Sequence, residues 1–266
     1  MKSIEVVQKD RSTFSIGEAI SDGWSLVSKH LGYYIAAGII VVLIGGAAGL
    51  IPFVGSLANS LIISPCFMAG AVFITWRISK GIDWTDFGDM FKGFNYLPKI
   101  MLSSLIESVV MAVLVVLFFF NLLPQIIDLV TLTQGDGFYN NRAEIEALAR
   151  EFFNAKTVVL FILLMIGILL VAVIWAFKIH FIVIYNMEAW PAMELSRKIC
   201  THNLFQLIGL FLLLGIIIVI SAIPCGIGLL FSLPLSIGAM YNAFAQITHC
   251  NQPDDIQFDY TGEGKV

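Results

Sequence analysis

Charged residues are scarce in this sequence. Only 13% of its 266 residues are charged, whereas 58% are apolar, and the mean hydropathy is +0.89. Soluble domains contain roughly a quarter charged residues, so the composition excludes an ordinary soluble protein and predicts an integral membrane protein. The net charge of −4, with scattered basic residues, is too small to indicate a nucleic-acid partner. We therefore expect membrane lipids as partners and no binding of nucleic acid.

Cysteine is also rare, and its positions have no framework spacing: Cys66, Cys200, Cys225 and Cys250. Structural disulfides are therefore not expected. No signal-peptide pattern is present, because the first apolar run begins at Leu31, after mostly polar or amphipathic residues.

Motifs that carry enzyme chemistry are missing. No nucleophile elbow, Walker loop, HExxH helix or glycine-rich dinucleotide turn occurs in a suitable context, so we expect no enzyme and no cofactor. Cys200 with His202, and His249 with Cys250, fall at one predicted membrane edge, where a Cys2His2 set could bind zinc. Their spacing is not a strong zinc pattern, and we expect no metal site.

An internal repeat is the strongest pattern present. Most key residues of Ile51–Ala71 return 172 positions later in Ile223–Ala243, without a slip in spacing. Each copy carries a stripe at i, i+4 and i+8 of a helix, made of Ser60, Ser64 and Met68 in the first and Ser232, Ser236 and Met240 in the second. Small residues let helices approach closely, so the stripes are predicted to pack at the axis relating the two halves. The alternative is that they line a pathway.

Long apolar runs predict six transmembrane helices, since about 20 apolar residues cross the hydrocarbon core. They are Leu31–Leu50, Ser56–Ser79, Lys99–Leu123 (ending at Pro124), Lys156–Phe177, Leu204–Ile223 and Ile227–Thr248. Amphipathic helices at the membrane interface are expected near 15–29, 83–94 and 188–202, the first with a Ser15/Glu18 capping box. The predicted fold is an all-α polytopic bundle.

The positions of the Lys and Arg residues indicate the orientation of the predicted bundle in the membrane. Twelve of the fifteen Lys and Arg residues fall on the face that holds both termini, so both termini are predicted to be cytoplasmic. Spans 1–2 and 5–6 then start from the same side, which makes the repeat parallel. We expect one membrane domain over residues 1–250, with repeat units 15–80 and 188–249 and spans 3 and 4 between them. Residues 251–266 are expected to form a polar cytoplasmic tail.

Several short motifs resemble a superfamily of uncharacterised bacterial multi-pass proteins that includes the membrane domain of some glycerophosphodiester phosphodiesterases. They are Gly23-Trp24-Ser25-Leu26 to Lys29-His30, the Pro52/Gly55 reversal, Asp89-Met90-Phe91-Lys92-Gly93-Phe94, and Ala192–Asn203. The resemblance implies a six-helix fold in the bacterial inner membrane. The catalytic barrel of those phosphodiesterases is absent here, so their activity is not carried over.

Glu107 lies near the middle of the third predicted span, where an ionisable residue is a functional candidate by default. Asn242 and Gln246 of the sixth predicted span are candidate partners. A protonated, hydrogen-bonded structural glutamate explains the pattern without any transport function, and this interpretation is favoured. We therefore expect a non-catalytic membrane module that interacts with lipid, with a membrane protein or with another copy of itself. The alternative is a small permease or channel with Glu107 in its pathway.

Overall fold

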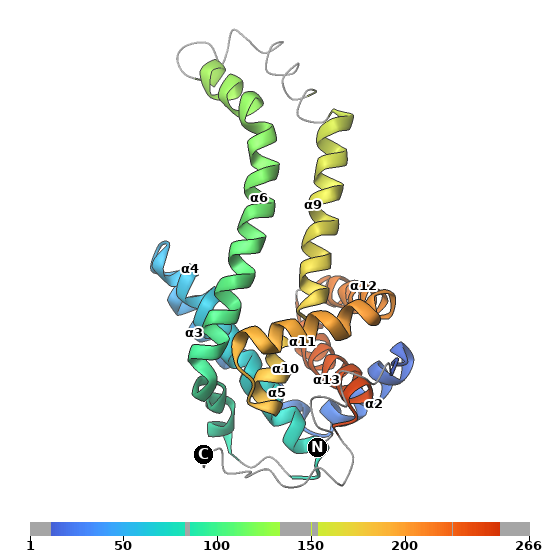
Figure 1. Cartoon of the computed structure of the whole chain (residues 1–266). Helices are drawn as coiled ribbons and strands as arrows, with labels where there is room; N and C mark the ends of the chain where they lie inside the picture. The colour runs from blue at the N-terminus through green and yellow to red at the C-terminus, as the bar shows by residue number, and fades with distance from the viewer. Residues whose placement is uncertain (1–11, 83–85, 134–149, 151–153, 225, 251–266) are drawn as a thin grey trace. The chain divides into compact units, whose positions relative to one another are not determined.

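The computed structural model describes residues 12–82, 86–133, 150, 154–224 and 226–250, and its regular elements are all helices (Figure 1). The all-α class predicted from the sequence is confirmed. The predicted polar tail, residues 251–266, lies outside the described residues.

The chain divides into two compact units. The first comprises Met1–Leu105 and Val173–Val266, and the second comprises Ile106–Ala172. The helices are α2 (Ile16–Ser28), α3 (Leu31–Gly49), α4 (Val54–Ala58), η1 (Asn59–Ile63), α5 (Ser64–Ser79), η2 (Phe87–Tyr96), α6 (Leu97–Thr133), α9 (Ala155–Ile174), α10 (Lys178–Tyr185), α11 (Ala189–His202), α12 (Leu204–Ala222) and α13 (Leu229–Thr248). The single domain predicted over residues 1–250 stays a prediction.

Five helical segments of the described chain are long and apolar enough to cross a membrane: Leu31–Gly49, Val54–Ser79, Phe87–Asp128, Ala155–Tyr185 and Leu204–Ala222. They correspond to the first five predicted spans and indicate a membrane protein. The sixth predicted span coincides with α13, which has a sufficient length of 20 residues but is not among these segments. Besides apolar residues, α13 contains Ser232, Ser236, Asn242 and Gln246.

The third predicted span extends further than the sequence suggested. We expected its helix to stop at Pro124, but α6 continues through Pro124 to Thr133. Proline removes only one helical N–H donor, and apolar helices tolerate that loss where other groups satisfy the backbone. One turn earlier, Asn121 Nδ2 donates to the carbonyl of Leu117 at 2.8 Å. In the second unit, α6 meets α9 through Phe118 and Phe161, whose ring centroids are 6.1 Å apart.

In the first unit, α2 packs along α13. Its buried face consists of Ala19, Gly23 and Val27, as the helical spacing predicts. At Gly23 the two backbones nearly touch, since a Cβ there would lie 2.5 Å from the Ala239 nitrogen. Only glycine allows this approach.

A second close crossing joins η2 to α5. A Cβ at Gly93 would overlap the Cys66 carbonyl oxygen, so this contact also requires glycine. Nearby, the buried carboxylate of Asp89 accepts from Arg77 and pairs with Lys92 at 2.8 Å. The predicted surface helix near residues 83–94 is therefore held to α5 by backbone contact and by an ion-pair cluster.

Candidate functional site

The two carboxamides predicted as partners of Glu107 lie in the first unit, where Asn242 binds the backbone of α2 and Gln246 binds that of its N-cap residue. Asn242 Nδ2 donates to the Glu18 carbonyl at 3.2 Å. Gln246 Oε1 accepts from the Ser15 backbone N–H at 3.0 Å. Ser15 Oγ in turn caps α2 by accepting from the Glu18 N–H, so the predicted capping serine is confirmed. Gln246 therefore serves the Ser15 amide, which is the role that a capping box gives to Glu18.

Glu107 lies in the second unit, near the beginning of the part of α6 that belongs to that unit. Its side chain is half-buried, and it lies within the apolar candidate span Phe87–Asp128. Ser103 and Ser104, which precede it on α6, are buried in the first unit, and Ser103 Oγ donates to the Ile100 carbonyl at 2.8 Å. The functional role predicted for Glu107 stays a prediction.

The two serine stripes of the repeat have different surroundings. Ser232 and Met240 are buried in α13 and Ser236 is half-buried, whereas Ser60 and Ser64 are exposed and Met68 is half-buried. Ser236 Oγ donates to the Ser232 carbonyl at 2.8 Å, and Ser60 Oγ donates to the Leu57 carbonyl at 3.2 Å. Packing of the two stripes against each other stays a prediction.

Within the described residues, no group of three or more His, Cys, Asp and Glu side chains is placed to hold a metal ion. Cys200 is buried in α11, where burial raises the pKa of its thiol to about 12. His180 is fully buried on α10, and its ring stacks on Phe244 with centroids 5.0 Å apart. Neither ring nitrogen of His180 has a hydrogen-bond partner. The surroundings of His180 are thus aromatic rather than metal-binding.

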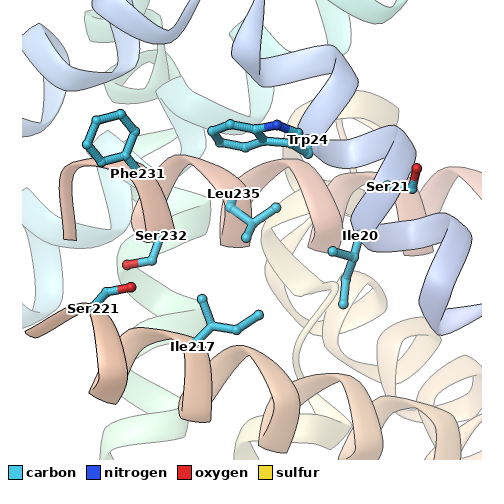
Figure 2. A pocket seen from close by; sticks show the side chains of 8 residues that line it. All are labelled: Ile20, Ser21, Trp24, Ile217, Ser221, Phe231, Ser232 and Leu235. Carbon is cyan, nitrogen blue, oxygen red and sulfur yellow. The ribbon is translucent and has the colours of Figure 1, made fainter. Parts of the chain in front are cut away.

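A cavity of about 390 Å³, largely open to the surface, lies between α2, α12 and α13 (Figure 2). Its lining consists of Ile20, Ser21, Trp24, Ile217, Ser221, Phe231, Ser232 and Leu235. Trp24 and Phe231 are its exposed aromatic side chains, at 38% and 47% exposure, so the cavity opens beside them. Ser232 is only 2% exposed, and its Oγ has no hydrogen-bond partner. Figure 2 shows the Ser232 and Ser221 hydroxyls turned toward the same space between two helices.

Sequence reasoning singled out Ser232 as a packing residue and did not find the cavity. The lining comes from α2 and from the α12–α13 hairpin, which lie about 200 positions apart in the chain. The repeat and the apolar pattern describe each helix alone, so neither signal reports which helices enclose a space.

No protein-family model, no curated protein and no solved structure matches this chain. The resemblance to the bacterial multi-pass superfamily stays a prediction from its short motifs.

Proposed function

We propose that the chain is a non-catalytic integral membrane module that binds lipid or another membrane protein. The observation that carries this proposal is the bonding of Asn242 and Gln246. A transport route needs polar side chains that face a water-filled path, but these two carboxamides bind the backbone of α2. The polar groups of α13 thus join two helices of one packed unit.

The proposal includes a parallel internal repeat, which one pair of contacts supports. The offset of 172 residues carries Cys66 of α5 to Gly238 of α13. At each of these positions the backbone meets a glycine of an amphipathic helix: Gly93 at Cys66 and Gly23 at Gly238. The equivalent crossings are expected if both copies inherited one way of binding an amphipathic helix.

The proposed setting is a bacterial inner membrane crossed six times, with both termini in the cytoplasm. The distribution of cations supports this orientation. The exposed polar face of α2 carries Glu18 and Asp22, and α2 packs along α13, so in a six-span setting this face must meet water or headgroups rather than lipid chains. Carboxylates cost about 2.5–3.5 kcal/mol each at the bilayer centre on insertion scales, so this face belongs in headgroups or water.

A small permease or channel is the second candidate function. It is favoured by the position of Glu107, because ionisable residues inside membrane spans often mark ion or substrate pathways. In this hypothesis the pathway follows Glu107 in the second unit.

Reconstitution of the full chain into liposomes separates the two functions. The experiment measures proton and cation flux with entrapped dyes, for the natural chain and for Glu107→Gln, and analyses the lipids retained after purification. A module retains lipid and conducts no more than protein-free liposomes. Flux that Glu107→Gln reduces, with the helix content unchanged, would establish the permease instead.

A further inference from the structure

We infer that the cavity between α2, α12 and α13 binds one acyl chain of an ester-linked membrane lipid, whose ester carbonyl accepts a hydrogen bond from Ser232 Oγ. The inference rests on the lipid-binding part of the proposed function, and it specifies the site, the lipid class and the bond that recognises it.

The walls and the mouth of the cavity favour hydrocarbon. Ile20, Ile217 and Leu235 line the cavity, and Trp24 and Phe231 lie where it opens. The exposed surface beside it is apolar as well, because Ile216 and Ile220 of the candidate span α12 are 57% and 59% exposed. A lipid chain can therefore enter from the bilayer without crossing a polar barrier.

Ser232 supplies the polar anchor. Buried hydroxyls in proteins almost always have a hydrogen-bond partner, yet Ser232 Oγ has none. Its neighbour one turn along, Ser236, satisfies its own hydroxyl by donating to the Ser232 carbonyl. Ser232 does not bond in this way within its helix, and Figure 2 shows its hydroxyl turned toward the hydroxyl of Ser221, which also lines the cavity. A hydrogen-bond acceptor that enters the cavity with the acyl chain would give the Ser232 hydroxyl the partner it lacks.

The absence of charged side chains from the lining indicates which kind of hydrogen-bond acceptor the site can bind. No Lys, Arg, His, Asp or Glu is among the lining residues. A fatty-acid carboxylate or a phosphate placed there would lose its water without gaining a counter-ion. A neutral ester carbonyl accepts from a hydroxyl without that penalty, so the charged headgroup stays outside, near Trp24. The site therefore fits a diacyl glycerolipid better than a free fatty acid.

The test measures binding of radiolabelled phosphatidylcholine to the delipidated, detergent-solubilised full chain by scintillation proximity. The same assay uses a dialkyl phosphatidylcholine, in which ether links replace the esters, and free palmitate. The natural chain should bind the diacyl lipid about three- to tenfold more tightly than the ether lipid, which is the range of one neutral hydrogen bond. Ser232→Ala should abolish this preference while leaving binding of the ether lipid unchanged.

Two matched pairs of variants control for folding and for cavity volume. Leu235→Trp fills the cavity and should weaken the binding of both lipids at least tenfold. Leu233 is exposed and lies outside the lining, so Leu233→Trp should leave the binding of both lipids unchanged. Ser236→Ala removes a hydroxyl already bonded within α13 and should keep the ester preference. Circular dichroism and gel filtration verify that each variant is folded.

The outcomes distinguish this site from the broader function. The proposed site is wrong if the natural chain binds ester and ether lipids with equal affinity. It is also wrong if the preference for the ester lipid survives Ser232→Ala. In either case saturable lipid binding would still support the broader proposal of a lipid-binding membrane module. Tighter binding of palmitate than of the diacyl lipid also overturns the proposed site. If no lipid binds saturably, both the site and the lipid-binding part of the proposed function fail.

Discussion

Gly238 of α13 lies against Gly23 of α2 so closely that a Cβ at Gly238 would be 2.5 Å from the Gly23 carbonyl oxygen. The crossing brings together two helices more than 200 positions apart in the chain. It also places α2 where its backbone reaches Asn242 and Gln246. Because the neighbouring atoms belong mainly to backbone, they cannot move aside as a flexible side chain would.

Gly238→Ala should therefore destabilise the folded chain by at least the 1–3 kcal/mol roughly typical of an overpacked core. Unfolding of the detergent-solubilised protein in increasing SDS, followed by circular dichroism, measures the change. Gly17→Ala is the matched control, since a Cβ at Gly17 meets nothing within 4 Å. It should leave stability equal or slightly higher, because alanine favours the helix. Equal stability of Gly238→Ala and the natural chain would contradict the packing of α2 on α13.

The ion-pair cluster of η2 and α5 leads to a second prediction. Asp89→Asn leaves Arg77 and Lys92 beside each other without their shared carboxylate, whose side chain is only 7% exposed. Charged hydrogen bonds contribute roughly 1.5–3 kcal/mol, so a loss of that size in the same SDS titration is expected. The exposed Asp22 of α2 provides the control: Asp22→Asn should change stability by less than about 0.5 kcal/mol. If Asp89→Asn leaves stability unchanged, the glycine crossing and the packing of Phe67 on Phe91 and Phe94 hold η2 to α5 without the ion pairs.

Thiol labelling tests the burial of three cysteines. Cys66, Cys200 and Cys250 are buried, and burial raises the pKa of both Cys200 and Cys250 above its usual value. Thiolate is the reactive form, and for a pKa of about 12 its fraction at pH 8 is about 10⁻⁴. In a Cys225→Ser background, these thiols should resist maleimide at pH 8 in the folded chain and react once it is denatured.

Raising the pH from 8 to 9 should speed the labelling of Cys200 about tenfold, because its thiolate fraction rises from about 10⁻⁴ to about 10⁻³. An added cysteine at the exposed Ser25 of α2 serves as the reactive control. Labelling of Cys200 at the rate of that control would show that α11 opens readily.

The number of spans can be tested at the two ends of the chain. Six spans place both termini on one side of the membrane, and the cations indicate the cytoplasmic side, so green fluorescent protein fused to either end should fluoresce. Alkaline phosphatase at the C-terminus should then be inactive, because it folds only outside the cytoplasm. An active C-terminal phosphatase together with a cytoplasmic N-terminus would leave five spans and exclude α13 as the sixth.

The presence of each helix and the residues at which it ends depend mainly on nearby residues in the chain, so the sequence predicts most of them. The span expected at Leu31–Leu50 is α3 at Leu31–Gly49, and the helix expected at 188–202 is α11 at Ala189–His202. Apolar length, capping residues and proline positions act within a few turns, so a single sequence reports them. The helix end predicted at Pro124 is wrong, because the effect of a proline depends on whether the surrounding helix tolerates a missing hydrogen bond.

Composition and helical periodicity alone predict that the chain is apolar and built from helices long enough to cross a membrane, and the described residues agree. The folded chain adds the bonds of Asn242 and Gln246 to α2 and its N-cap, the burial of Ser232 while Ser60 is exposed, and the cavity that opens beside Trp24. The physical reason is that hydropathy and helical spacing act through neighbours in the chain. Hydrogen bonds between helices, and the spaces the helices enclose, depend instead on residues some 200 positions apart.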